Sequence, residues 1–249
     1  MKLENKVVIV TGAGSGIGRE VAIRFATAGA RVVVSDIAEA GAQETLKSIT
    51  SNGGTGYLVK ADTSKAGDHE ALVGETVRHF GALHVAVNNA GIGGPGAPTG
   101  EYPLDGWDRV IAVNLSGVFY GMRYQIPAIK AAGGGSIVNI ASILGQVAFR
   151  NSPAYVAAKH GVVGLTKNAA VEYAQENIRV NVVGPGFIRT PLVEDRMDEQ
   201  TLKAIAAMHP MNRLGTVTEV ADLVVWLASG QASFVTGAYF AVDGGYLAQ

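Results

Sequence analysis

Short runs of consecutive apolar residues alternate with longer segments of helical periodicity along almost the whole chain. Apolar side chains at successive positions are typical of strands buried on both faces of a sheet. Such runs predict strands at 6–10, 31–36, 57–61, 84–88, 136–142, 179–183 and 239–242. Apolar residues at three- and four-residue spacing predict helices at 17–28, 38–50, 65–80, 104–131, 154–175, 199–208 and 217–228. Pro127 is expected to interrupt the longest of these helices.

This alternation predicts a single α/β domain over residues 1–249, because no Pro- or Ser-rich linker, repeat or charge run divides the chain. Right-handed crossovers through the helices give a doubly wound (Rossmann) parallel sheet of about seven strands, with helices on both faces. Ligands of such sheets bind beyond the carboxyl ends of the strands. The residues that follow each strand are therefore the first candidates for function.

Composition narrows the class of protein. Hydrophobic residues make up 48% and charged residues 16% of the chain, which favours a folded core. The net charge of −1, without a basic block, argues against a nucleic-acid partner. The absence of cysteine excludes disulfides and Cys-ligated zinc, and we expect no metal. Without a membrane-spanning or signal-like apolar run, we expect a cytoplasmic protein with no membrane partner.

A glycine-rich turn follows the first predicted strand. Its sequence does not fit the common G-x-G-x-x-G fingerprint, but it fits T-G-x-x-x-G-x-G on Thr11, Gly12, Gly16 and Gly18. A tight turn at the start of a helix brings backbone N–H groups and the positive end of the helix dipole close to an anion. The turn is therefore interpreted as the pyrophosphate site of a dinucleotide, although an ordinary strand-to-helix turn has the same composition.

Asp36 ends the second predicted strand and indicates the type of dinucleotide. A carboxylate there accepts hydrogen bonds from the adenosine ribose hydroxyls and repels a 2′-phosphate. Neither Ser15 nor Ile37 offers a cation to reverse that preference. We therefore expect NAD as the cofactor, while noting that Asp36 also suits the cap of the following helix.

A Tyr–Lys pair and a serine suggest acid–base chemistry. Tyr155 and Lys159 are spaced to lie on one face of a helix, and Ser142 ends the fifth predicted strand. The reference pKa of tyrosine is about 10, and a neighbouring cation favours the phenolate. Ser142 can hold a substrate oxygen, and Asn114 can position a water for proton return. A Tyr–Lys pair by itself is common on solvated helices, so the interpretation depends on the combination.

Taken together, these motifs resemble the short-chain dehydrogenase/reductase family over essentially the whole chain. Further matches are Asn-Asn-Ala-Gly at 88–91, Pro-Gly at 185–186 and Thr190. The resemblance implies that Tyr155 is the general acid/base, Ser142 the partner of the substrate oxygen and Asn114 a member of the proton relay. It also implies that Lys159 binds the nicotinamide ribose.

The resemblance extends the expected cofactor site beyond the glycine turn. It implies that Asp62 bonds adenine, that the Ile188 backbone and the Thr190 hydroxyl lie near the carboxamide, and that 88–91 stabilise the sheet beside the cofactor. The complete expected set is Gly12, Ser15, Gly16, Ile17, Gly18, Asp36, Asp62, Asn89, Ala90, Gly91, Tyr155, Lys159, Pro185, Gly186, Ile188 and Thr190.

The family also implies a homotetramer whose long helices at 104–131 and 154–175 pack against their copies. Loops at 91–103, 143–153 and 187–213 are expected to line an apolar pocket for a neutral secondary alcohol or ketone, with 187–213 as a lid. Their apolar members are Ile92, Ile143, Leu144, Val147, Phe187, Leu192, Met197 and Met208.

The expected function is hydride transfer between NAD and a secondary alcohol or ketone. A 3-oxoacyl-thioester reductase, which commonly uses NADPH, and a sugar or steroid dehydrogenase are alternatives within the same family. A non-catalytic dinucleotide sensor is the alternative from another class, and the intact set of Asn114, Ser142, Tyr155 and Lys159 argues against it. A sugar-nucleotide epimerase would need a further C-terminal substrate domain.

Overall fold

A parallel β-sheet forms the centre of the molecule. The computed structural model describes residues 3–194 and 198–249. Within these residues the sheet has seven strands in the order β3-β2-β1-β4-β5-β6-β7, and all neighbours are parallel. The strands are β1 (Val7–Thr11), β2 (Arg31–Asp36), β3 (Thr55–Lys60), β4 (Val85–Asn88), β5 (Gly135–Ile140), β6 (Ile178–Pro185) and β7 (Tyr239–Val242). The predicted doubly wound parallel sheet is confirmed.

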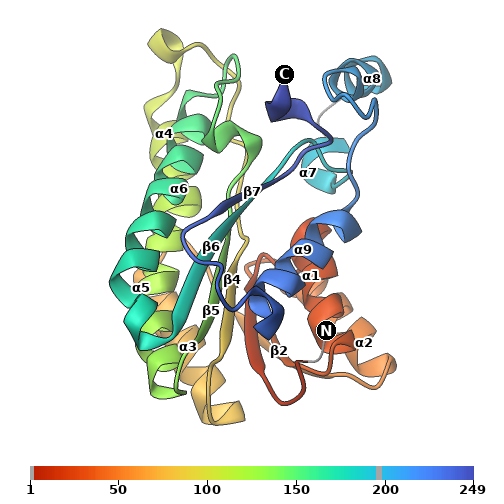
Figure 1. Ribbon diagram of the computed structural model, residues 1–249. Helices are drawn as coiled ribbons and strands as arrows, with labels where there is room; N and C mark the ends of the chain where they lie inside the picture. The colour runs from red at the N-terminus through yellow and green to blue at the C-terminus, as the bar shows by residue number, and fades with distance from the viewer. Residues whose placement is uncertain (1–2, 195–197) are drawn as a thin grey trace.

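Helices cover both faces of this sheet (Figure 1). One layer contains α1 (Gly16–Thr27), α2 (Glu39–Ser51) and α9 (Val217–Ala228). The other contains α3 (Ala66–Phe80), α4 (Leu104–Ile111), α5 (Gly117–Ala131) and α6 (Pro153–Tyr173). Two short helices, α7 (Pro191–Glu194) and α8 (Glu199–Ala207), lie beyond the end of the sheet at which the strands finish.

The strand sequence explains why two helical layers are needed. Side chains of a strand alternate between the faces of the sheet. Val8 and Val10 of β1 pack into the core under α1 and α9, whereas Ile9 between them packs into the core under α5 and α6. All three side chains are fully buried, so a continuous apolar run requires cover on both faces.

The predicted helix at 104–131 is interrupted, but Pro127 is not the cause. A π-helical turn, Ala112–Ser116, separates α4 from α5, while α5 continues through Pro127. Proline removes one N–H donor and leaves the carbonyl of Arg123 without its helical partner. Both Pro127 and Arg123 are exposed, so water can satisfy that carbonyl. The wide turn instead carries Asn114, and such turns are frequent at functional sites.

Several strand boundaries differ from their predicted positions by one to two residues. The most relevant is β5, which ends at Ile140, two residues before Ser142. Ala141 still donates from its N–H to the Val183 carbonyl, at 2.8 Å. Ser142 therefore follows the last ladder hydrogen bond and begins the loop instead of ending the strand.

Candidate active site

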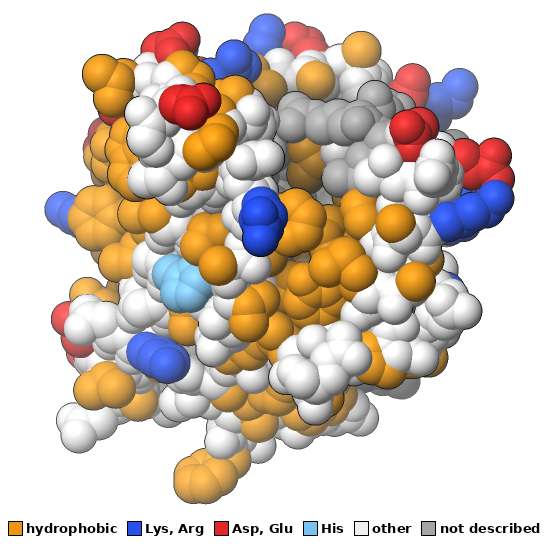
Figure 2. All heavy atoms as spheres, turned by 90° about the horizontal axis from the view of Figure 1, so that it is seen from above, with side chains coloured by type: hydrophobic (Ala, Val, Ile, Leu, Met, Phe, Trp, Pro, Cys, Tyr) orange, Lys and Arg blue, Asp and Glu red, His pale blue; other side chains and the backbone are white. Residues whose placement is uncertain are grey.

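A cavity of about 900 Å³ lies at the carboxyl ends of the strands. Seen from that end, hydrophobic side chains gather in a hollow near the centre of the face (Figure 2). Its lining comes from the segments that follow β1 to β6, as expected for a doubly wound sheet. Expected site residues in the lining are Gly12, Ser15, Gly16, Ile17, Asp36, Asp62, Asn89, Ala90, Gly91, Ser142, Tyr155, Lys159, Pro185, Gly186, Ile188 and Thr190.

The turn after β1 is held against the turn after β4. Thr11 Oγ1 accepts hydrogen bonds from the N–H groups of Asn89 and Ala90, and Asn89 Nδ2 donates to the Gly12 carbonyl at 3.2 Å. Gly12 has φ +63°, and a Cβ there would lie 2.8 Å from Ala90 Cα. Glycine is therefore required both for the backbone conformation and for the close approach of the two turns.

The start of α1 faces the cavity through this turn. Its N-cap, Ser15, makes no side-chain capping hydrogen bond, and the first turn carries no acidic residue. The helix N-terminus thus keeps the N–H groups and dipole that favour an anion. Gly18 does not line the cavity: a Cβ there would lie 2.1 Å from the Gly12 carbonyl oxygen, so this glycine permits close helix–strand packing.

Asp36 lies at the rim of the cavity and is fixed by two backbone groups. Its Oδ2 accepts from the Gly14 N–H and its Oδ1 from the Ala38 N–H, both at 2.8 Å. The side chain therefore joins the glycine turn to the start of α2, where Ala38 is the N-cap. Arg19 is nearby, but its guanidinium bonds the Gly14 carbonyl and Glu44.

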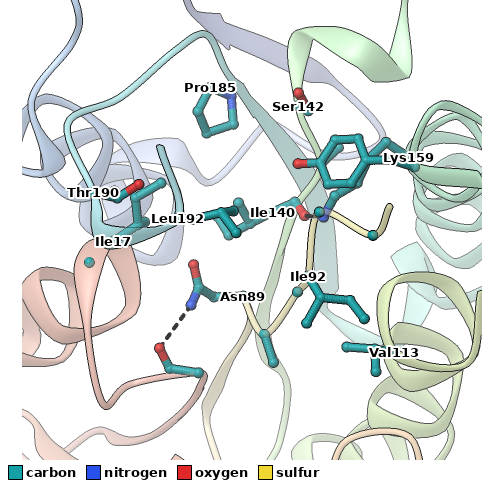
Figure 3. Close-up of a pocket in the computed structure, with 18 of the residues that line it drawn as sticks. Ile17, Asn89, Ile92, Val113, Ile140, Ser142, Lys159, Pro185, Thr190 and Leu192 are labelled. Atoms are coloured by element: carbon teal, nitrogen blue, oxygen red, sulfur yellow. Dashed lines mark hydrogen bonds between the residues drawn. The ribbon is translucent and has the colours of Figure 1, made fainter. Parts of the chain in front are cut away.

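Ser142, Tyr155 and Lys159 meet at one wall of the cavity. Figure 3 shows Ser142 and Lys159 across the cavity from Ile17 and Thr190. Lys159 Nζ lies 5.5 Å from the centre of the Tyr155 ring and donates to the Ile140 carbonyl at 2.8 Å. Ser142 Oγ accepts from the Leu144 N–H at 3.1 Å. The start of the loop after β5 and the helix α6 thus bring together the three residues that the sequence predicts for this wall.

The electrostatics of this wall differ from the prediction in one respect. Burial raises the pKa of Tyr155, and a hydrogen bond with Ser142 acts in the opposite direction. Burial also lowers the pKa of Lys159 to about 8. In the chain without cofactor, the pKa of Tyr155 is therefore not lowered by Lys159 as predicted. Desolvation disfavours both the Tyr155 phenolate and the Lys159 ammonium.

Lys159 should make the stability of the cofactor-free protein depend on pH. An unfolded lysine has a pKa of about 10.4, so between about pH 8 and pH 10 the unfolded chain binds a proton that folded Lys159 has lost. Stability linked to this side chain therefore increases with pH. The difference in unfolding free energy, wild type minus Lys159→Met, should rise by about 2–3 kcal/mol from about pH 7 to 10.

Urea unfolding at both pH values measures this difference. Lys167→Met, at an exposed lysine on the same helix, is the matched control, because it removes one lysine and keeps the buried Lys159. A difference for Lys159→Met that does not change between pH 7 and 10 would contradict the lowered pKa.

Asn114 is buried on the π-helical turn, behind the cavity wall. Its Oδ1 accepts from the Ile92 N–H and its Nδ2 donates to the Ile92 carbonyl, both at 2.8 Å. The amide thus fixes the start of the loop that follows β4. A Cβ added at Gly91 would lie 3.3 Å from Asn114 Oδ1 and 3.7 Å from Lys159 Nζ, which places both groups beside that loop. The relay role of Asn114 stays a prediction.

The remainder of the cavity is largely apolar. Ile92, Ile143, Leu144, Phe187 and Leu192 line it as predicted. Val147 and Met208 are not among its lining residues, and Met197 lies outside the described residues. The segment 187–213, which is predicted to act as a lid, contains α7 and α8.

Sequence reasoning missed Phe149 as a lining residue. Its ring lies 5.7 Å from the ring of Phe187, and Phe187 in turn lies 5.8 Å from His209 and 6.3 Å from Tyr246. His209 Nε2 accepts from the Phe187 N–H at 3.3 Å. The apolar wall is therefore supported by the C-terminal turn, a long-range contact that no local pattern in the sequence reveals.

The described part of the chain holds no group of three or more His, Cys, Asp or Glu side chains arranged to bind a metal. None of the helices in residues 3–194 and 198–249 combines the length and apolar character needed to cross a membrane.

Comparisons with known proteins match nearly the whole chain. A family model described as enoyl-(acyl carrier protein) reductase matches residues 12–247. Cyclohexanol dehydrogenase of Acinetobacter sp. (strain SE19) is 51% identical over 98% of this chain and 96% of that protein. Cis-4-hydroxycyclohexanecarboxylate dehydrogenase of Sinomonas cyclohexanicum is 44% identical over 98% and 97%. A crystal structure of levodione reductase superposes with a TM-score of 0.97 at 36% identity, covering 99% of both chains.

Proposed function

Since the chain belongs to the short-chain dehydrogenase/reductase family and is an oxidoreductase of CH–OH groups, we propose that it oxidises alicyclic secondary alcohols with NAD. The observation that carries this proposal is the convergence of Ser142, Tyr155 and Lys159 on a cavity that also contains the glycine turn and Asp36. The names of the two relatives above, both dehydrogenases of cyclohexane alcohols, support the substrate class.

The residues present fit a nicotinamide dinucleotide. The N-terminus of α1, which has no side-chain cap, suits the pyrophosphate. Thr190 lines the cavity beside this turn, since its methyl group would lie 3.3 Å from a Cβ at Gly16. Asp36 is proposed to accept hydrogen bonds from the adenosine ribose through lone pairs that Gly14 and Ala38 do not use. Asp62, after β3, is proposed to bond the adenine. When bound there, NAD would supply the acceptor for the hydride of the carbinol carbon and a positive ring that favours the Tyr155 phenolate.

In the proposed mechanism, Tyr155 removes the proton from the substrate hydroxyl. Ser142 Oγ already accepts from the Leu144 N–H, so its single O–H is proposed to donate to Tyr155 in the free chain and to the substrate oxygen in the complex. Lys159 uses one of its three N–H groups on the Ile140 carbonyl, which leaves two for the ribose of the nicotinamide half. In its ammonium form, Lys159 favours the phenolate that forms on Tyr155 during turnover.

The apolar end of the cavity supports a compact cyclic substrate. Ile92, Leu144, Phe149 and Phe187 supply hydrophobic contact, and Ser142 and Tyr155 supply the polar groups that orient one oxygen. A six-membered ring enters such a pocket already rigid, whereas an open chain must lose torsional freedom. The same features accept cyclohexanol and its ring-substituted derivatives.

Initial rates with NAD test the proposal. The value of kcat/KM should be about tenfold higher for cyclohexanol than for 2-hexanol, which corresponds to about 1.4 kcal/mol of avoided ordering cost. Acetoacetyl-CoA with NADPH serves as the comparison for a thioester reductase. Faster turnover of that pair than of cyclohexanol with NAD would favour the alternative function.

A homotetramer remains part of the proposal. Leu104, Trp107 and Phe119, on α4 and α5, are 80%, 39% and 47% exposed in the single chain. Large apolar side chains at the surface are compatible with burial against a second copy.

A further inference from the structure

The hydroxyl of Tyr239 reaches from the last strand to the backbone of Ser142. Tyr239 begins β7 and pairs with Val182 of β6, while β5, which leads into Ser142, lies on the far side of β6. Its Oη nevertheless donates to the Ser142 carbonyl at 3.1 Å. Neighbouring strands are about 4.8 Å apart, so this contact spans two strand spacings. The side chain therefore crosses over β6.

Gly184 provides the space for this crossing. It lies two residues beyond Val182 in β6 and thus on the same face of the sheet. A Cβ at Gly184 would lie 1.9 Å from Tyr239 Oη, so any side chain there would displace the phenol. Burial, with a contribution from the charge of Asp243, raises the pKa of Tyr239. The phenol consequently stays protonated and remains a donor.

Ser142 needs such support because the sheet ladder ends just before it. The Ser142 carbonyl accepts from the Gly145 N–H at 2.9 Å as well as from Tyr239, and Ser142 Oγ accepts from Leu144. The two contacts with 144 and 145 are local and would move together with the loop. The contact from Tyr239 ties the same peptide to a strand that is not next to β5.

We propose that Tyr239 is a positioning residue that fixes Ser142 in its orientation toward Tyr155 and the substrate oxygen. This inference rests on the proposed function, in which Ser142 binds that oxygen. Tyr239 lies outside the lining of the cavity, so it acts through Ser142 and does not touch the substrate. A displacement of about 1 Å in a reacting group is sufficient to reduce turnover markedly.

The test compares Tyr239→Phe with Tyr57→Phe. Both remove one phenolic hydroxyl, but Tyr57 bonds Glu75 on α3, outside the cavity lining. Tyr239→Phe keeps the ring, and the Ser142 carbonyl keeps its bond from Gly145, so the variant should fold. For cyclohexanol oxidation, kcat should fall about three- to tenfold in Tyr239→Phe, with the KM for NAD changed less than about twofold. Tyr57→Phe should match the wild type.

A substrate-free titration separates this inference from the proposed function. The Ser142 hydrogen bond lowers the pKa of Tyr155, so a displaced Ser142 should raise it. The absorbance of phenolate, taken as a difference against the matching Tyr155→Phe proteins, should show the Tyr155 transition at higher pH in Tyr239→Phe than in wild type. An unmoved transition, or kcat equal to that of Tyr57→Phe, would overturn the role of Tyr239. Absence of wild-type turnover on every alcohol would overturn the proposed function, while the titration would still decide on Tyr239.

Discussion

Replacing Tyr155 with Phe is expected to lower kcat for cyclohexanol oxidation by about 10²–10⁴-fold, the range typical of general acid–base catalysis. The substitution keeps the ring, which lines the cavity beside the buried cluster of Val110, Ala154 and Ala158. It removes only the oxygen that is proposed to take the substrate proton. Binding of NAD should change little, because the glycine turn and Asp36 are untouched.

Initial rates at saturating cyclohexanol and NAD, together with the dissociation constant of NAD, measure the two effects. Tyr102→Phe is a suitable control, since Tyr102 packs in the same cluster but does not line the cavity. That variant should retain kcat within about twofold, because the change creates no large cavity. Near wild-type kcat in Tyr155→Phe would contradict the assignment of Tyr155 as the acid/base.

Asp36 should produce the second large effect, a preference for NAD over NADP of about a hundredfold or more in kcat/KM. Each hydrogen bond from a ribose hydroxyl to a carboxylate contributes about 1.5–3 kcal/mol. A 2′-phosphate would replace one of these bonds with repulsion of about 4 kcal/mol per charge at 4 Å and an effective dielectric of 20. The hydrogen bonds to the ribose and the repulsion of the phosphate both favour NAD over NADP. The Arg19 guanidinium donates to the Gly14 carbonyl and to Glu44, so it is poorly placed to offset the repulsion between Asp36 and a 2′-phosphate.

Two variants at the rim test this preference. Asp36→Asn removes the charge and retains one oxygen acceptor. That oxygen can still accept from the Gly14 N–H, while the Ala38 N–H at the start of α2 loses its acceptor, so the variant should reduce the NAD preference and keep the contact with the glycine turn. Adding Ile37→Arg, at a side chain that lines the cavity and is 60% exposed, should then favour NADP, because a guanidinium binds phosphate through two parallel bonds. Ile37→Gln is the uncharged control. Equal wild-type kcat/KM with NAD and NADP would contradict this role of Asp36.

The sequence was sufficient to predict the sheet and the relative placement of the main motifs. Continuous apolar runs such as 7–10 are typical of strands that are covered on both faces, and the strands therefore indicate the class of fold. The carboxyl ends of parallel strands meet at one edge, which predicts that Asp36, Asn89 and Ser142 face a common cavity, and all three line it. These predictions depend on local patterns and on one topological rule.

Features that depend on contacts between distant segments could not be predicted. The π-helical turn at Asn114 is stabilised by a pair of hydrogen bonds to Ile92, and nothing in the helical periodicity of 104–131 indicates it. The hydrogen bond from Tyr239 to Ser142 depends on the register of β7 and on the missing side chain at Gly184. Desolvation of Tyr155 likewise reflects packing that the spacing of Tyr155 and Lys159 does not reveal.

The central claim is that this cavity transfers a hydride from a secondary alcohol to NAD, and cyclohexanol deuterated at the carbinol carbon tests it most directly. The wild-type protein is incubated with this alcohol and NAD, and the reduced cofactor is analysed by mass spectrometry alongside the ketone. We expect one deuterium in each NADH and one cyclohexanone for each NADH. Absence of NADH, or NADH that carries no deuterium, would contradict the account.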